Sequence, residues 1–346
     1  MEQIMSENPL DARGEARLYQ TLRRFWHPVM YAADLQTGPE RVVLLGEEVV
    51  LVRLGGEVRA FHDLCVHRGT PLSLGSVEGD QLRCAYHGWT YGSDGVCTAI
   101  PARHGPNIPA RARLRPYRAV EDHGLIWVAL EEPMFPVPAM PEFDDPAFRI
   151  VTVPTYDWTC GVARRVENFV DFAHIAWVHD GSIGDRSRPE VPEHEVRREG
   201  GELRWEATLI EPPNDKLDLA LTDGPVSSDN RWRLFVPNTV WFHQVMPGDM
   251  QWVVYIAVSP IGPKECRTFT FMARNYDFDE DEEKYIQFQL EIAEQDRVVT
   301  ESQKPEELPV DLSAELHIRG VDKVSLEYRK WLVELLDPDP ELYRAH

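Results

Sequence analysis

Two short motifs, each pairing a cysteine with a histidine, constrain this chain most. Cys65 and His67 are separated by one residue, Cys84 and His87 by two, and residues 68–83 join the motifs. Two thiolates and two imidazoles in mirrored loops fit a [2Fe-2S] cluster in which the thiolates hold one iron and the imidazoles the other. The same donors could hold zinc, but a Cys2His2 zinc finger keeps both cysteines in one knuckle and both histidines in the other. The mixed knuckles therefore favour the two-iron cluster.

The residues around these ligands resemble those of the Rieske non-haem iron oxygenases. The first motif reads Cys-Val-His-Arg-Gly-Thr-Pro-Leu over residues 65–72, and the second reads Cys-Ala-Tyr-His-Gly-Trp over residues 84–89. Gly69, Pro71 and Gly88 fit tight loops whose N–H groups can point at the cluster sulfurs. The resemblance implies the catalytic α subunit of such an enzyme.

Length and composition predict a two-domain globular protein. The chain has 346 residues, of which 43% are hydrophobic and 27% charged, and this length exceeds that of one small electron-transfer domain. The net charge of −22 argues against nucleic acid and anionic membranes as partners. No apolar run approaches the ~20 residues of a membrane span, and residues 1–24 lack a signal-peptide core, so we expect a cytoplasmic protein. Cys97, Cys160 and Cys266 form no disulfide framework and are expected to be buried thiols.

The pattern of elements predicts an α+β fold. A first group of strand-like runs precedes the proline-rich residues 131–146, at residues 41–45, 49–54, 57–61 and 124–130. A second group follows them, at residues 203–210, 231–236, 240–246, 250–260 and 267–276. Helices are expected near residues 161–178 and 282–303. The first group predicts a small antiparallel β domain that presents the cluster loops, and the second predicts one large antiparallel sheet. The resemblance implies a helix-grip (START-like) fold for the second.

We expect four parts along the chain. Residues 1–24 should form a helix that packs on the catalytic domain, and residues 25–130 the Rieske domain. Residues 131–146 contain five prolines in the segment from Pro133 onward, which neither a helix nor a central strand tolerates, and are read as a linker. Residues 147–346 should form the catalytic domain.

A second candidate metal site follows from histidines in the predicted catalytic domain. Asp171 and His174 are three residues apart, which places them on one face of a helix. His174 and His179 are five apart, so their joint ligation requires the helix to deform or end between them, and residues 180–181 supply a stop. Two imidazoles and one carboxylate leave positions open on Fe(II) for O2 and substrate. Two histidines held by hydrogen bonds in a helix are the alternative.

The third ligand is predicted to be Asp296. The apolar stripe of its helix falls at steps of three and four and includes this carboxylate: Tyr285, Phe288, Ile292, Asp296 and Val299. A carboxylate within such a stripe needs a metal or a cation, whereas Glu294 and Glu301 lie off the stripe. A buried ion pair of Asp296 with Arg164 or Arg165 is the alternative. The resemblance supports ligation, since a Gln-x-Pro turn follows at residues 303–305.

The resemblance implies a different task for Asp171. In this family a carboxylate joins an iron-ligating histidine, here His174, to a cluster histidine of a neighbouring subunit, here His87, in a trimer. Glu167 and Asn168 are expected either to support the ligands or to lie on the helix surface. Possible substrate contacts are Asn168, Trp177, Asn238, Trp241, His243 and Trp252, although most could be core or strand surface.

The predicted function is that of a terminal oxygenase that hydroxylates or N-/O-demethylates a small aromatic or heterocyclic compound. The chain lacks a Gly-rich dinucleotide motif, so a separate NAD(P)H-dependent reductase or ferredoxin should supply electrons. The resemblance favours a monooxygenase or demethylase, and residues 315–323 and 328–331 carry this preference. A ring cis-dihydroxylating dioxygenase is one alternative. A Rieske electron carrier fused to a non-catalytic ligand-binding domain is another.

Overall fold

The computed structural model describes residues 17–105, 107–212, 225–309 and 311–336. The chain forms two compact units, residues 23–137 and residues 1–22 with 138–346. We call them the β unit and the α+β unit. The division near residue 137 falls within the stretch predicted as a linker, and the functional boundaries predicted above remain predictions. Within the described residues, none of the helices is long and apolar enough to cross a membrane.

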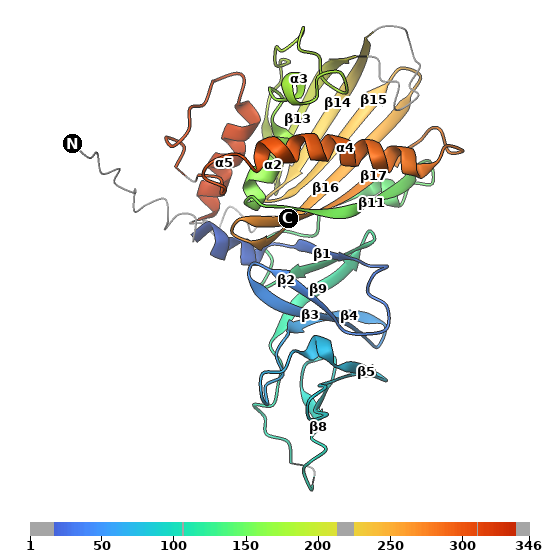
Figure 1. Ribbon diagram of the computed structural model, residues 1–346, viewed down its shortest axis with the longest axis vertical. Helices are drawn as coiled ribbons and strands as arrows, with labels where there is room; N and C mark the ends of the chain where they lie inside the picture. The colour runs from blue at the N-terminus through green and yellow to red at the C-terminus, as the bar shows by residue number, and fades with distance from the viewer. Residues whose placement is uncertain (1–16, 106, 213–224, 310, 337–346) are drawn as a thin grey trace, which may run out of the picture. The chain divides into compact units, whose positions relative to one another are not determined.

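The β unit contains a six-stranded and a four-stranded antiparallel sheet (Figure 1). The first has the order β1-β10-β9-β4-β3-β2 and contains β1 (His27–Tyr31), β2 (Glu40–Leu44), β3 (Glu47–Leu54), β4 (Glu57–His62), β9 (Pro116–Asp122) and β10 (Leu125–Ala129). The hairpin β3–β4 shows how sequence sets register. Gly55 and Gly56 have φ of +63° and +82°, as a two-residue turn matched to strand twist requires, so Leu54 pairs with Glu57.

The four-stranded sheet carries the second cluster motif. It consists of β5 (Ser76–Glu78), β6 (Gln81–Arg83), β7 (Thr90–Tyr91) and β8 (Cys97–Ala99), and the short helix η2 (Leu72–Leu74) precedes it. Cys84 directly follows β6, and Tyr91 ends β7. Because β6 and β7 pair, the loop between them is held at both ends.

The α+β unit is built on a seven-stranded antiparallel sheet. Its order is β11-β17-β16-β15-β14-β13-β12, with β11 (Arg149–Trp158), β12 (Arg197–Glu199), β13 (Glu202–Glu211), β14 (Val226–Phe235), β15 (Thr239–Met246), β16 (Met250–Gly262) and β17 (Glu265–Arg274). Buried and exposed residues alternate along β13, whereas the central strand β16 is buried almost throughout. A strand buried on both faces reads as a continuous apolar run.

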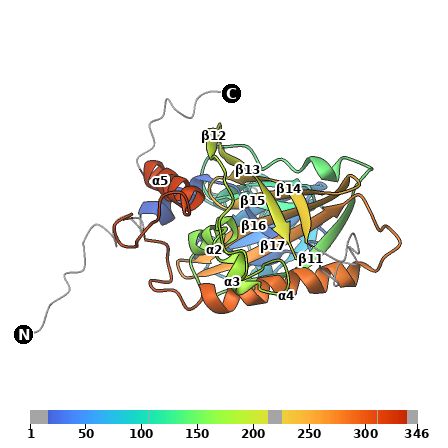
Figure 2. The ribbon, with the colours of Figure 1, turned by 90° about the horizontal axis from the view of Figure 1, so that it is seen from above.

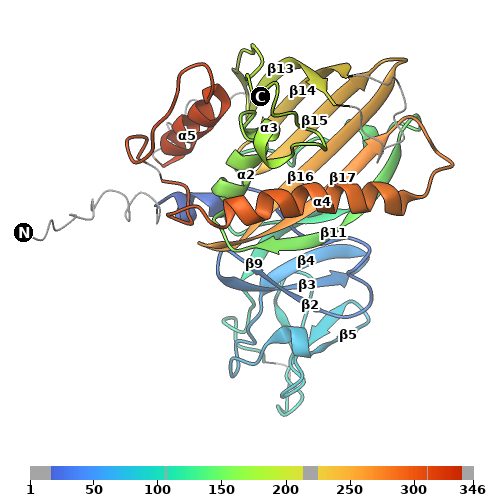
Figure 3. The same ribbon diagram turned by 45° about the horizontal axis from the view of Figure 1, so that its top comes forward.

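Three helices lie on one face of this sheet (Figures 2 and 3). They are α2 (Val162–Val170), α3 (Ile175–Val178) and α4 (Glu282–Thr300). Three further helical segments are α5 (Lys323–Leu335) and the 3-10 helices η1 (Leu22–Arg24) and η3 (Pro141–Phe143). Asp281 caps α4, because its side chain accepts a hydrogen bond from the Glu283 N–H. The long helix across the sheet gives the helix-grip arrangement, and the α+β prediction is confirmed. Helix α5 and strand β11 were not among the predicted elements.

Candidate metal centres and the active-site cavity

The two cluster motifs adopt matching loops. In each, the cysteine N–H donates to the carbonyl five residues later, at 2.8 and 2.9 Å, and the N–H of the glycine four residues later donates to the cysteine carbonyl, at 2.9 and 3.1 Å. Gly69 and Gly88 have φ of +71° and +68°, a region that favours glycine. The loops therefore hold Cys65 and Cys84 in equivalent positions.

The cluster donors are arranged with the thiols inside and the imidazoles outside. Cys65 and Cys84 are each 2% exposed, whereas His67 is partly exposed and His87 exposed. The imidazole centroids lie 4.5 Å apart, and the Tyr91 hydroxyl lies 3.1 Å from the Cys65 Sγ. Burial raises the pKa of the Cys84 thiol, and the neighbouring Cys65 raises it further. This donor set suits a [2Fe-2S] cluster whose histidine-bound iron faces the surface.

A single zinc ion fits these four residues less well. Ligands of one tetrahedral ion converge on one point, as metal–donor distances of about 2.0–2.3 Å require. In the part of the chain that the structure describes, donors of three or more such residues come within 4.8 Å of one another only at His174, His179 and Asp296. The two cysteines and two histidines are more spread out, as two irons require.

His174, His179 and Asp296 converge in the α+β unit. Asp296 Oδ1 lies 3.3 Å from His174 Nε2 and 3.1 Å from His179 Nε2. The side chain of His174 is 17% exposed, that of His179 is 2% exposed and that of Asp296 is 7% exposed. Their chemistry, two imidazoles and one carboxylate with further space beside them, fits Fe(II) with open positions.

The local backbone brings the two histidines together. His174 precedes the single helical turn of α3, and His179 follows it, so the two histidines flank this turn and do not lie on the long helix that was expected near residues 161–178. Gly181 continues the chain with φ of +80°. Gly184 packs against this turn so closely that a Cβ there would lie 2.0 Å from the Ile175 carbonyl oxygen.

One helical prediction needs correction. Asp171 and His174 do not share a helical face, because α2 ends at Val170 and Asp171 is extended, with φ of −81° and ψ of 128°. Its carboxylate instead accepts the N–H groups of Ala173, at 3.0 Å, and His174, at 3.2 Å. Asp side chains compete for the backbone in this way and break helices.

Two amide side chains support the triad. Gln295 Oε1 lies 2.7 Å from His179 Nδ1, which orients that imidazole. Asn168 Nδ2 donates to Asp296 Oδ1 at 3.2 Å, and Arg165 Nη1 donates to Asn168 Oδ1 at 3.0 Å. Asn168 thus stands between Arg165 and the carboxylate. Gln295 was not predicted as a site residue, and its only signal in the sequence is its place beside Asp296.

The remaining charges near α2 are paired among themselves. Arg164 Nη2 and Arg329 Nη2 each lie 2.5 Å from the Glu315 carboxylate, and Arg329 Nη2 also lies 2.6 Å from Glu167. Arg164 therefore has a carboxylate partner other than Asp296. Glu167 belongs to this network rather than to the triad.

The triad has a strongly perturbed electrostatic environment. Burial lowers the pKa of His174, but Asp171, whose Oδ2 lies 3.3 Å from His174 Nδ1, and Asp296 outweigh it and raise the pKa to about 9. Burial raises the pKa of Asp296, yet the two histidines hold it far below its usual range. Titratable groups that shift each other's pKa in this way make the triad a candidate functional site.

An aromatic cavity opens beside the triad. It is lined by Phe169, His174, Ile175, His179, Ile183, Leu209, Glu211, Trp232, Phe242, Gln244, Trp252, Val254, Phe288, Gln289, Ile292 and Asp296. Trp232 and Phe242 are stacked, with centroids 5.1 Å apart and planes inclined by 29°. Flat aromatic walls with a few polar groups suit a planar substrate. Of the proposed substrate contacts, Trp252 lines this cavity.

The structure corrects the other proposed substrate contacts. Trp241 and His243 lie on β15, but alternate residues of a strand face opposite sides, and the cavity side carries Phe242 and Gln244. Trp241 instead donates to Glu142 at 3.2 Å, and His243 Nε2 lies 2.9 Å from the Gln251 Oε1. The predicted strand was right, but the predicted face was wrong.

Asn168, Trp177 and Asn238 also do not line the cavity. Asn168 supports Asp296, as described above. Trp177 is 56% exposed, because α3 is a single turn on the surface of the unit. Asn238 is buried and its side-chain amide donates to the Val258 carbonyl.

Comparison with known proteins identifies the family. Residues 25–118 match the model of the Rieske [2Fe-2S] domain, and residues 158–338 match that of the vanillate O-demethylase oxygenase C-terminal domain. The chain is a Rieske non-haem iron oxygenase. Its cofactors are therefore a Rieske [2Fe-2S] cluster and a mononuclear non-haem iron.

Similar proteins cover nearly the whole oxygenase. The chain is 34% identical to methylxanthine N1-demethylase NdmA of Pseudomonas putida, over 92% of this chain and 91% of that protein. It is 32% identical to methylxanthine N3-demethylase NdmB of the same species, over 91% and 89%. The structure of Pseudomonas putida CBB5 NdmA with caffeine matches with a TM-score of 0.82 at 32% identity, covering 92% of each chain.

The Gln295 contact gives a prediction for this oxygenase. Gln295→Leu should weaken Fe(II) binding by about 10–100-fold, because an imidazole that loses its outer hydrogen bond loses its orientation and basicity. Iron titration followed by equilibrium dialysis measures the change. Gln287→Leu is the matched control, since Gln287 lies exposed on the same helix and its amide donates to the exposed Glu283 at 2.6 Å. Equal iron affinity in both variants would refute the supporting role of Gln295.

Proposed function

We propose that this oxygenase removes a methyl group from a nitrogen of a planar N-methylated heterocycle, with methylxanthines as the first class to test. The observation that carries the proposal is that His174, His179 and Asp296 border a cavity with stacked aromatic walls. The similarity to two methylxanthine N-demethylases over about nine-tenths of the chain supports it. A flat ring stacked on Trp232 and Phe242 would lie beside the triad.

We assign the site residues as follows. Cys65, Cys84, His67 and His87 hold the cluster. His174, His179 and Asp296 hold Fe(II), and the two centres when bound supply single electrons and the activation of O2. Gln295 and Asn168 fix the orientation of His179 and Asp296, and the aromatic walls exclude water from the methyl group.

The reaction balances as a two-electron monooxygenation. The substrate N–CH3 group, O2, two electrons and two protons give N–CH2OH and water. The N–CH2OH product then breaks its C–N bond, which yields the N–H heterocycle and formaldehyde. The same oxidation at an O–CH3 group gives O-demethylation, so the class of substrate depends on the cavity and not on the ligand set.

Asp171 is proposed as the electron-transfer bridge between subunits. Its carboxylate touches His174 and is 27% exposed, and it borders a surface cavity with Gln303, Leu316 and His317. A homotrimer would bring the cluster of one subunit to this surface of the next. Electrons would reach the cluster from an NAD(P)H-dependent reductase, with or without a ferredoxin. A cytoplasmic location remains a prediction.

A single-turnover experiment tests the reaction. Chemically reduced, iron-loaded protein is mixed with O2 and trideuteromethyl caffeine, theobromine or vanillate, and trapped formaldehyde is analysed by mass spectrometry. We expect formaldehyde with two deuterium atoms from a methylxanthine and none from vanillate. Formaldehyde from vanillate alone would make the enzyme an O-demethylase. A ring product that gains both atoms of labelled O2 would make it a dioxygenase.

A further inference from the structure

A row of polar side chains crosses the inner face of three strands beside the cavity. Ser228 and Asn230 share a face of β14 with Trp232, because they are two residues apart. Asn230 pairs with Gln244 on β15, and Glu211 ends β13 on the neighbouring side. Glu211 and Gln244 both line the cavity that the triad borders. Polar groups in an otherwise aromatic wall are candidates for substrate recognition.

The hydrogen bonds of this row fix the orientation of the Gln244 amide. Its Nε2 donates to Glu211 Oε2 at 2.8 Å and to Ser228 Oγ at 3.1 Å, and Asn230 Nδ2 donates to the same hydroxyl at 2.8 Å. Both N–H bonds of Gln244 are thereby used. Its Oε1 remains as an acceptor beside the Glu211 carboxyl group.

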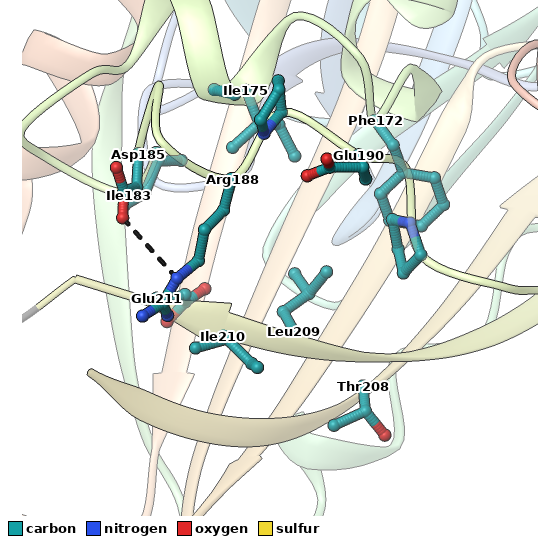
Figure 4. A pocket seen from close by; sticks show the side chains of 14 residues that line it. Phe172, Ile175, Ile183, Asp185, Arg188, Glu190, Thr208, Leu209, Ile210 and Glu211 are labelled. Carbon is teal, nitrogen blue, oxygen red and sulfur yellow. Dashed lines mark ion pairs between the residues drawn. The ribbon is translucent and has the colours of Figure 1, made fainter.

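Glu211 has no cationic partner of its own within the described residues. Burial raises its pKa to about 7, although the hydrogen bond from Gln244 lowers it. The adjoining cavity holds Asp185, Arg188 and Glu190 on the loop after α3 (Figure 4). Arg188 Nε lies 3.9 Å from Asp185, so this arginine is already associated with a carboxylate.

The charged groups on the other side of the cavity belong to the triad. His174, His179 and Asp296 face Glu211 across the substrate space. The pKa of Glu211 is shifted by burial and by the hydrogen bond from Gln244. The triad residues and the loop residues Asp185, Arg188 and Glu190 are not among the causes of this shift. Glu211 is thus a carboxyl group that can be neutral near physiological pH.

We propose that Glu211 and Gln244 together recognise the lactam edge of the substrate, an N–H group next to a carbonyl. This inference rests on the proposed function, since it names the heterocycle edge that the same cavity selects. Gln244 Oε1 accepts the substrate N–H, and the protonated Glu211 carboxyl donates to the adjacent carbonyl. A substrate methylated on that nitrogen leaves both protein groups unpaired, which is costly in a buried site.

Theobromine and caffeine are matched probes, because theobromine has an N–H between two carbonyls and caffeine carries a methyl group there. Isothermal titration of the oxidised holoenzyme should give a Kd for theobromine about tenfold lower than that for caffeine near pH 6. Near pH 8.5 the preference should shrink, because the Glu211 carboxylate can no longer donate to the carbonyl and only the contact of the substrate N–H with Gln244 Oε1 remains. 2-Pyridone and N-methyl-2-pyridone give the same comparison without the xanthine ring.

Two variants separate donation from packing. Glu211→Gln keeps a neutral donor at every pH, so the preference should persist near pH 8.5. Glu211→Leu removes the donor, so the preference near pH 6 should already be as small as that of the unmodified enzyme near pH 8.5. Glu206→Gln is the control on the same strand, because Glu206 is exposed and pairs with Arg231. It should behave as the unmodified enzyme at both pH values.

The outcomes distinguish this inference from the proposed function. Equal affinity for both members of both probe pairs near pH 6, or no detectable binding of either lactam, overturns the recognition by Glu211 and Gln244 even if demethylation occurs. A lactam preference without any formaldehyde from methylxanthines supports the recognition and overturns the N-demethylase proposal.

Protein stability gives a test without a ligand. A carboxyl group whose pKa is raised in the folded state opposes folding once the unfolded chain has ionised, above its ordinary pKa of about 4.3. Glu211→Gln should therefore raise Tm at pH values above 7, and the gain should shrink as the pH falls toward about 4. If the Tm of Glu211→Gln differs from that of the unmodified protein by the same amount near pH 4 and above pH 7, the folded protein does not bury an ionised Glu211 carboxylate.

Discussion

Asp296→Asn should reduce turnover by about 1000-fold or more, with the mononuclear iron lost and the [2Fe-2S] cluster retained. The change removes the negative charge between His174 and His179, which lies within 3.3 Å of both. The neutral amide is a poor ligand for Fe(II). Iron content should fall from about three to about two per chain, on the counting of one cluster and one mononuclear site. Iron analysis and the visible spectrum of the cluster measure both parts.

A neighbouring acid on the same helix provides the control. Glu294 is exposed and pairs with Arg297 at 2.6 Å, so Glu294→Gln should keep about three irons and full turnover. If the unmodified protein never exceeds two irons per chain after reconstitution with ferrous iron, the chain would be an electron carrier and the triad would be structural. Wild-type iron content in Asp296→Asn would remove this residue from the ligand set.

Asp171→Asn should leave both metal sites filled and lower steady-state turnover by about 100-fold or more. Asn keeps one acceptor oxygen, which can still accept the N–H group of Ala173, whereas its Nδ2 cannot replace the oxygen that accepts the N–H group of His174. One of the two hydrogen bonds that fix this turn should therefore remain. The variant also loses the negative charge next to His174, through which we expect electrons to enter from the neighbouring subunit. Stopped-flow absorption should show a reduced cluster that is no longer reoxidised by O2 and substrate.

Asp157→Asn makes the same chemical change at a surface ion pair with Arg267, 2.7 Å away, and should leave turnover unchanged. Normal turnover in Asp171→Asn would refute the bridge. Reoxidation at the normal rate combined with lost turnover would instead place the defect after electron transfer.

The sequence predicted parts of this fold well and others poorly, for identifiable reasons. The strand-like runs from residue 203 onward correspond to β13 to β17, because β-branched and aromatic residues are concentrated there. The edge strand β11 carries a proline and was not predicted. Within α4, Asp296 was found because it lies in the buried stripe, although Val299 in the same stripe is 47% exposed.

The cavity beside the triad shows where sequence reasoning failed to identify the lining residues. Trp241 and His243 were predicted to line the cavity, but the residues that do so are Phe242 and Gln244, which lie on the opposite face of the same strand. The burial pattern could not distinguish the two faces, because β15 has buried residues on both. Amphipathic alternation identifies the inner face only when the other face is exposed. Here η3 and the residues around Glu142 cover the second face, and the Trp241 and Tyr255 side chains contact Glu142 there.

The sequence by itself determined the chemistry: mixed cysteine–histidine knuckles for the cluster, and two histidines with a carboxylate in an apolar stripe. These signals are local, because ligand spacing and helical periodicity are properties of short segments. Only the tertiary structure decided which residues meet across the chain. The approach of Asp296 to His174 and His179, the support from Gln295, and the row from Glu211 to Gln244 depend on how α4 and the sheet pack, which local spacing does not encode.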